Sequence, residues 1–197
     1  MQGRGRVPKK KRPLDETALR DLALSYVARF ATTGAKLEQY CARKIRERGV
    51  AEDEDGRTKE LDVTGLVTRF IELGYIDDAA YARSKSRDLT ARGYGARRVE
   101  QALWAAGVEE DVRGDSAPGE GESRRAAVLL ARKRRFGPFG VAPEEEPDHE
   151  ARHKAREKQV AAMLRAGHLY DHVRFILEAT DEAQVEEWIE EGEANAD

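Results

Sequence analysis

The chain has 197 residues, of which 37% are charged and 7% aromatic, so it can form one domain or several small ones but has little material for a large core. The single cysteine, Cys41, excludes an internal disulfide, which is typical of the reducing cytoplasm. No apolar run approaches the roughly 20 residues needed to cross a bilayer, so a membrane protein is not expected. Abundant Ala, Leu, Glu and Arg, with no alternating β-branched stretch, favour an all-α fold.

One short pattern recurs four times along the chain. An apolar residue is followed by three residues and then a glycine, next by a bulky residue and soon by an acid; the four glycines are Gly49, Gly74, Gly107 and Gly167. A glycine can take the left-handed conformation that closes a helix, and an acid suits the start of the next one. The repetition predicts short helical units laid end to end.

The predicted elements of the first half follow this pattern. Residues 1–13 are basic, contain no acid and lack apolar periodicity, which predicts a disordered arm. A helix is expected over about 15–31, with Phe30 on its apolar face. A second helix, capped by Thr33, closes at Gly49, a charged loop covers 51–60, and a third helix closes at Gly74.

The second half continues in the same way. A helix starts at Asp77–Asp78 and ends near Gly93, and the next one, with Val99, Ala102, Leu103 and Trp104 as its apolar residues, closes at Gly107. Residues 111–121 are predicted to be a linker. A helix containing 126–130, a long helix over about 148–166 and a last helix from about 173 onward complete the chain.

We therefore predict three repeats of about three helices each. The expected boundaries are a basic arm at 1–13, a first repeat at 14–76, a second repeat at 77–120 that is shortened or ends in a brief helix and linker, a third repeat at 121–192, and a disordered acidic end at 193–197. Each repeat is too small to bury its own core well, so stacking on its neighbours matters.

The centre of the chain resembles a known family. Residues 73–83, LGYIDDAAYAR, are similar to the central signature of the RecX family of recombinase regulators, and the match continues through RGYG at 92–95 to LWAAGV at 103–108. Residues 37–50 and 163–177 also fit, so the resemblance covers about 15–180.

The resemblance implies tandem three-helix repeats in an elongated, curved arrangement. It also implies a regulator that is not an enzyme, needs no cofactor and binds RecA–single-stranded DNA filaments, restraining recombination, DNA repair and the SOS response. The partner would be the recombinase filament, with direct contact to single-stranded DNA left open, and the protein would act as a cytoplasmic monomer.

Two basic clusters are candidates for contact with that partner, because the planar guanidinium group donates paired hydrogen bonds to phosphates and carboxylates. The first cluster has Asp88 as its only interior acid and consists of Arg83, Lys85, Arg87, Arg92, Arg97 and Arg98. The second follows a helix and consists of Arg132, Lys133, Arg134 and Arg135, with Arg124 and Arg125 about two turns upstream. The alternative for both is an ordinary solvated helix face.

Two other interpretations of the sequence are possible beside that of a recombinase regulator. The chain could be a general helical nucleic-acid-binding protein that acts without a recombinase. It also contains His149-Glu150-Ala151-Arg152-His153, which matches the H-E-x-x-H zinc motif of metallopeptidases. The charged surroundings of that motif argue against a water-excluding catalytic cleft, so no metal site is predicted.

The charge is strongly segregated along the chain. Every charged residue from Glu178 to the end is acidic, whereas the first thirteen residues carry only positive charge. One hypothesis is that the acidic tail competes with DNA for the basic faces.

Overall fold

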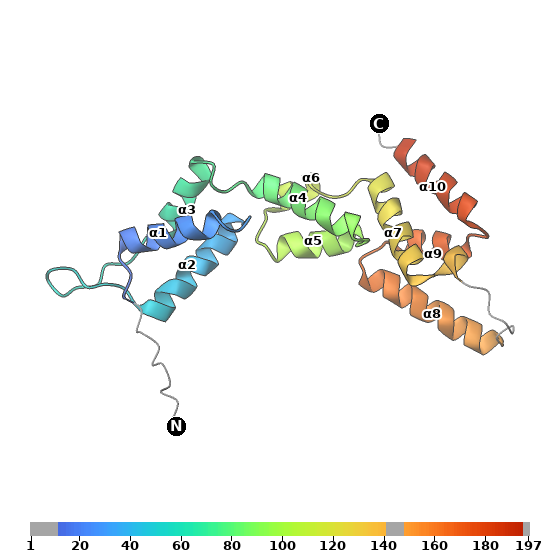
Figure 1. The fold of residues 1–197 in the computed structure, drawn as a ribbon, viewed down its shortest axis with the longest axis horizontal. Coiled ribbons are helices and arrows are strands. Elements are labelled where there is room, and N and C mark those ends of the chain that lie inside the picture. The colour runs from blue at the N-terminus through green and yellow to red at the C-terminus, as the bar shows by residue number, and fades with distance from the viewer. Residues whose placement is uncertain (1–11, 141–147, 195–197) are drawn as a thin grey trace, which may run out of the picture. The chain divides into compact units, whose positions relative to one another are not determined.

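The computed structural model describes residues 12–140 and 148–194, and within those ranges every regular element is helical (Figure 1). The chain forms two compact units that meet between Asp78 and Ala79. The predicted all-α class built from helical repeats is confirmed. Most of the basic arm and the end of the acidic tail lie outside the described residues.

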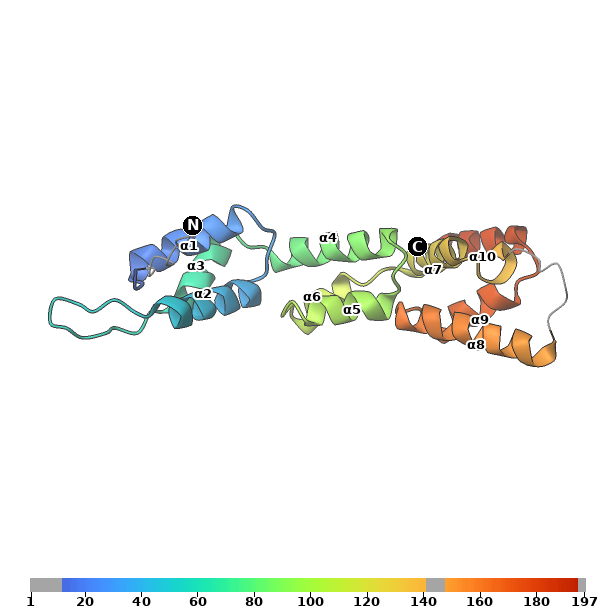
Figure 2. The same cartoon turned by 60° about the horizontal axis from the view of Figure 1, so that its bottom comes forward.

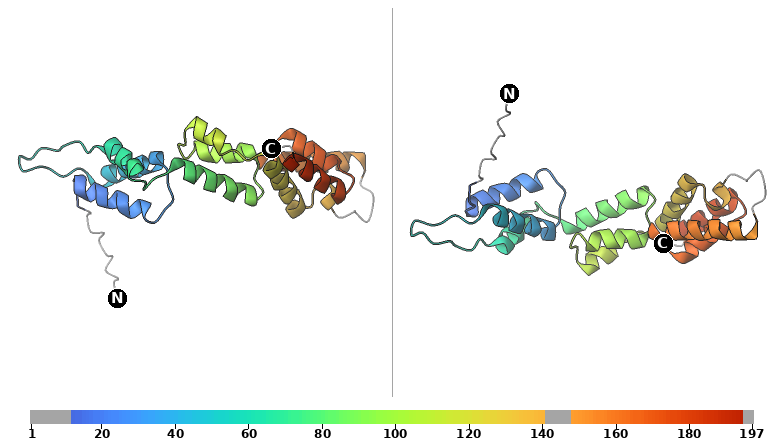
Figure 3. Two further views of the ribbon diagram at one scale, coloured as in Figure 1. Left: turned by 90° about the horizontal axis from the view of Figure 1, so that it is seen from above. Right: turned by 90° about the horizontal axis from the view of Figure 1, so that it is seen from below.

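The first unit contains α1 (Glu16–Val27), α2 (Gly34–Arg48) and α3 (Val63–Glu72). Asp15, Thr33 and Asp62 each cap one of these helices, accepting a hydrogen bond from a backbone N–H in the first turn. Buried apolar side chains of all three helices form one cluster, which includes Cys41. The loop between α2 and α3 projects away from the three helices (Figure 3).

The second unit opens with α4 (Asp78–Ala91), α5 (Ala96–Trp104) and the short α6 (Glu110–Asp115). These helices share a small core centred on Ala82, Leu89, Val99 and Leu103. Helix α6 occupies much of the stretch predicted to be a linker. Two acids at its start and the turn that follows Gly107 are enough to begin a helix there, even though the segment is poor in apolar residues.

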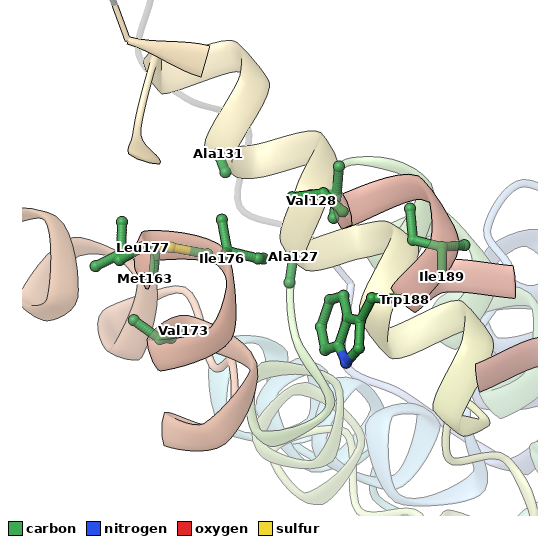
Figure 4. Close-up of a cluster of buried hydrophobic side chains, with 10 residues drawn as sticks. Ala127, Val128, Ala131, Met163, Val173, Ile176, Leu177, Trp188 and Ile189 are labelled. Carbon is green, nitrogen blue, oxygen red and sulfur yellow. The ribbon is translucent and has the colours of Figure 1, made fainter. Parts of the chain in front are cut away.

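The rest of the second unit contains α7 (Glu120–Arg134), the 3-10 helix η1 (Gly137–Phe139), α8 (His149–Arg165), α9 (Tyr170–Glu178) and α10 (Glu182–Ala194). Their core joins α7, α8, α9 and α10 around Met163, Ile176 and Trp188 (Figure 4). The first unit contains one apolar core and the second unit contains two, and the division into three repeats remains a prediction.

Several sequence expectations need correction. The first helix ends at Val27, so Phe30 lies beyond it and is 57% exposed instead of packed on the helix face. The single last helix is two helices, α9 and α10, because Ala179 adopts an extended conformation that ends the first. Residues 193 and 194 continue α10 instead of beginning a disordered end.

The recurring glycine joint is confirmed. Gly49, Gly74, Gly107 and Gly167 have positive φ angles of 79°, 74°, 72° and 94°. A side chain would strain each of these positions, which explains why glycine recurs where a helix closes.

Candidate partner-binding surface

The basic residues of α4 lie on two flanks of that helix. Arg83 and Arg87 are exposed and one turn apart, so they share a flank. Lys85 is half-buried and lies about 200° around the helix from Arg83, since each residue advances about 100°. None of the three forms an ion pair with another described residue. The predicted cluster is therefore divided, with its two arginines together and its lysine apart.

Arg92 follows the end of α4 and is partly engaged. Its guanidinium lies 3.4 Å from the carboxylate of Asp88, one turn earlier, and 5.5 Å from the ring centroid of Tyr94. Both interactions are exposed, so they stabilise the protein by well under about 1 kcal/mol. Arg92 can exchange them for a partner at little cost.

Arg97 and Arg98 begin α5 and are both exposed. Neither forms an ion pair within the described part of the chain. Their backbone is nevertheless held firmly, because Arg97 N donates to the carbonyl of Gly167 at 3.1 Å and Gly95 N donates to the carbonyl of Ala166 at 3.0 Å. Two unpaired guanidinium groups thus project from a fixed helix start.

This helix start touches the turn between α8 and α9, backbone against backbone (Figure 2). A Cβ atom added to Gly95 would lie 2.4 Å from the carbonyl carbon of Gly167, and one added to Gly167 would lie 2.4 Å from Arg98 N. Real side chains do not approach this closely. The two glycines therefore allow the second and third groups of helices to meet.

His168 secures the same joint. Its ring is buried, and Nε2 donates to the carbonyl oxygen of Gly93 at 3.1 Å. Nδ1 is also buried and has no partner among the described residues. Burial lowers the pKa of His168 to about 4, although the hydrogen bond to Gly93 opposes that shift. At neutral pH the ring is uncharged, and it fixes the turn before α5.

Sequence reasoning missed one exposed residue of α5. Trp104 was grouped with the apolar core residues, but it is 69% exposed. Arg97, Gln101 and Trp104 are four and three residues apart, so they share the face opposite the buried Val99 and Leu103. Plotting the helix by its 3.6-residue period, instead of noting that tryptophan is apolar, would have revealed this position.

The second basic cluster is largely occupied by the protein itself. Arg132 pairs with Glu182 at 3.3 Å and with Glu186, and it also lies 5.1 Å from the ring centroid of Phe139. Lys133 Nζ donates to the carbonyl of Arg92 at 3.3 Å. Arg134 and Arg135 are exposed and form no ion pair within residues 12–140 and 148–194.

Both upstream arginines of this cluster also have partners within the protein. Arg124 Nε donates to Glu120 at 2.6 Å, its Nη1 donates to the carbonyl of Trp188 at 2.7 Å, and Arg125 pairs with Glu193. Burial raises the pKa of the Glu120 carboxyl, but its hydrogen bond from Arg124 and the nearby His172 outweigh that effect and hold the pKa below its ordinary value. Helix α10 thus lies along α7 and supplies acids to it (Figure 3).

The possible zinc and thiol chemistry has little geometric support. His149 and His153 are exposed in the first turns of α8, and the described residues contain no group of three or more side chains suited to holding a metal ion. Burial raises the pKa of the Cys41 thiol to about 11, with a further contribution from Glu38, so the thiolate is scarce at neutral pH.

None of the described helices is both long and apolar enough to span a membrane.

Comparisons with known proteins agree with this architecture. Residues 77–115 match the family model described as the second three-helix domain of RecX. The chain is 30% identical over 178 residues to the "Regulatory protein RecX" of Myxococcus xanthus, covering 88% of this chain and 91% of that relative. It is 26% identical over 124 residues to the protein of the same name from Vibrio parahaemolyticus, covering 63% and 74%.

Solved structures give the same result for the fold. The crystal structure of RecX from Lactobacillus salivarius superposes with a TM-score of 0.59 at 18% identity, covering 82% of this chain and 94% of that one. A second RecX crystal structure gives 0.58 at 18% identity, covering 83% and 72%. With the extended match to the Myxococcus relative, these findings establish that the chain belongs to the RecX family of regulatory proteins.

Proposed function

We propose that this protein binds RecA–single-stranded DNA filaments in the cytoplasm, as a monomer, and restrains the recombinase. The observation that carries the proposal is the membership of the RecX family, which rests on a match to 91% of a relative named as a regulatory protein. The arginines of α4 and α5 that are exposed and form no ion pair with a described residue support it, because they suit an anionic partner. This function requires binding and no chemical step.

The proposed mechanism is occupancy of the filament. Helical repeats with cationic faces lie against neighbouring recombinase subunits and hinder the addition of subunits or hasten their loss. The contacts are many and individually modest, so the affinity should fall steeply as salt rises.

The ion pairs within the protein indicate which of the predicted basic residues are most available to a partner. Arg83, Arg87, Arg97 and Arg98 are exposed and need break no ion pair to engage a partner. Lys85 is half-buried and Arg92 is weakly engaged, so we assign both a smaller share. In the second cluster, Arg134 and Arg135 are better placed than Arg132 and Lys133, which already have partners in the protein.

The direct test is recombinase ATP hydrolysis on single-stranded DNA with increasing amounts of this protein. We expect inhibition at less than one molecule per recombinase subunit, because each molecule would affect several subunits. Hydrolysis that stays unchanged even at an excess of the protein would contradict the proposal. Equal affinity for bare and recombinase-coated DNA at matched salt would favour a general nucleic-acid-binding protein.

A charge-reversal variant tests the proposed surface. Arg97→Glu with Arg98→Glu replaces two unpaired cations by anions, so half-inhibition should require at least about tenfold more protein, equivalent to about 1.4 kcal/mol. The matched control is Arg152→Glu with Lys154→Glu, which makes the same change in net charge at exposed positions of α8. If both variants weaken inhibition equally, the effect is due to net charge and the assignment of α5 is wrong.

A further inference from the structure

The outward face of α5 combines cations with a largely exposed aromatic ring. Arg97, Gln101 and Trp104 follow one another along this face, and Arg98 lies on the adjacent flank. From Arg97 to Trp104 the helix rises about 10 Å. Tryptophan exposes a large apolar surface here that no other described side chain covers, because 69% of it remains accessible.

The cations of this face form no ion pair with a described residue, whereas the acids Glu100 and Asp171 each have a cationic partner. Glu100, on the neighbouring flank of α5, accepts a hydrogen bond from Arg113 at 2.6 Å. Asp171, at the start of α9, lies 3.7 Å from Arg174. Arg97 and Arg98 form no ion pair within the described residues, so this part of the surface attracts anions.

A second exposed aromatic residue follows the backbone contact of Arg97 by a few residues. The backbone of Arg97 is hydrogen-bonded to Gly167, and Tyr170, which is 56% exposed, follows Gly167 by three residues. Three residues of chain span at most about 11 Å, so Tyr170 starts within that distance of the joint. Arg165, in the last turn of α8, is exposed and has no ion pair among the described residues. The arginines of α5 thus have Trp104 on their own helix and Tyr170 nearby.

We propose that this face of α5 binds single-stranded nucleic acid directly, with Arg97 and Arg98 contacting phosphates and a base stacking on the indole of Trp104. Base stacking on aromatic rings combined with backbone contacts to cations is the usual mode of sequence-tolerant single-strand binding. On α5 itself, Trp104 is the sole aromatic residue and shares its face with Arg97 and Gln101; such an isolated ring suits a base, whose edges stay hydrated. An apolar protein pocket would require a contiguous apolar patch around it.

This inference rests on the proposed function for its biological setting. It deepens that function by naming nucleic-acid bases as one of the groups that the regulator contacts. Its test contains no recombinase. Failure of the test therefore leaves filament regulation standing, and failure of the ATP hydrolysis test leaves the strand contact standing.

The protein carries its own reporter for this contact. Its two tryptophans differ sharply, since Trp104 is 69% exposed and Trp188 is 8% exposed within the core. Titration of the full-length protein with oligothymidylate should quench the emission of exposed indole, and Trp104→Phe should abolish that quenching. Emission that is unchanged at saturating oligothymidylate overturns the proposal.

Substitutions of Trp104 and Arg97 then distinguish base stacking from the effects of side-chain size and of charge. Binding of a labelled oligothymidylate and of an abasic strand of equal length is measured by anisotropy at matched salt. Trp104→Leu should weaken binding of the base-bearing strand about fivefold to a hundredfold and leave binding of the abasic strand unchanged, whereas Trp104→Phe retains most of the affinity. Arg97→Gln should weaken the binding of both strands.

The remaining outcomes count against the proposal. If Trp104→Leu retains the affinity for oligothymidylate, or weakens both strands equally, no base stacks on residue 104. If it retains that affinity and loses recombinase inhibition, the indole instead enters an apolar pocket of the recombinase. Because Trp104 is exposed, these variants should fold, and circular dichroism checks that they do.

Discussion

The arginines of α4 and α5 and those of α7 look alike in the sequence but have different roles in the structure. In α4 and α5, Arg83, Arg87, Arg97 and Arg98 are exposed and unpaired among the described residues. In α7, Arg124, Arg125 and Arg132 pair with acids of α7 itself or of α10. The difference comes from one acidic helix that covers only the second cluster.

This comparison shows that the local density of positive charge does not determine how much of it is available to a partner. The α10 acids that pair with Arg132 and Arg125 lie 50 to 68 residues further along the chain. They are brought there by the packing of Trp188 and Ile189, not by the charges, since exposed ion pairs contribute little on their own. The acidic tail is therefore part of the third group of helices.

The largest expected effect comes from removing the anchor of α10. Trp188 stacks on Phe175 with ring centroids 4.6 Å apart and lies under Arg124 at 4.7 Å. Trp188→Ala should lower the free energy of unfolding by about 4 kcal/mol, measured by urea denaturation. The matched control is Trp104→Ala, which should change it by less than about 0.5 kcal/mol because that ring is exposed. Similar losses in the two variants would contradict the packing described for α10.

The contact between the start of α5 and the turn between α8 and α9, which His168 secures, should weaken in acid. The pKa of His168 is lowered to about 4 in the folded protein and lies near 6.5 in the unfolded chain. The neutral ring therefore contributes its full stability above about pH 6.5 and loses it as the pH falls toward about 4, in total about 3 kcal/mol. His168→Phe removes the hydrogen bond to Gly93 and lowers stability at pH 7, but it should flatten this part of the pH profile.

The control for that experiment is the exposed His153. His153→Gln removes an exposed histidine of α8 that takes no part in the contact made by His168, so it controls for the loss of an imidazole. If His168→Phe retains the full loss of stability between about pH 6.5 and 4, the carboxylates cause it and not His168.

The smallest expected effect comes from removing the acidic partners of Arg132, which makes the second basic cluster more like the first. Glu182→Gln with Glu186→Gln removes the acids that face Arg132 while leaving the buried residues of α10 in place. Stability should fall by less than about 1 kcal/mol, because these pairs are exposed. Binding of oligothymidylate at low salt should increase severalfold, because Arg132 is released.

This double variant also replaces a cruder test of the acidic tail. Deleting residues 181–197 would remove Val185, Trp188 and Ile189 from the core, so any change in binding would be confounded by unfolding. Binding that is unaffected by Glu182→Gln with Glu186→Gln would show that the acids of α10 do not compete with nucleic acid. The matched change Glu187→Gln with Glu190→Gln, at exposed residues that form no ion pair with the described residues of α7, controls for net charge.

The sequence predicted the joints better than it predicted the surfaces. The glycines that close the helices and the cap Thr33 depend on local backbone conformation, which neighbouring residues fix. Trp104 and Phe30 were placed on core faces because they are apolar, yet both are exposed. Apolarity alone cannot distinguish a core residue from a surface contact in a protein with so small a core.

By itself, the sequence determined the all-α fold, the four glycine joints at which helices close, and the family to which the chain belongs. These depend on short-range backbone preferences and on a contiguous signature, both of which are encoded locally. Only the tertiary structure decided which arginines remain free, because that depends on the long-range packing of α10 against α7. The outward position of Trp104, by contrast, follows from the helical period of α5, whose other side packs against α4 and α6.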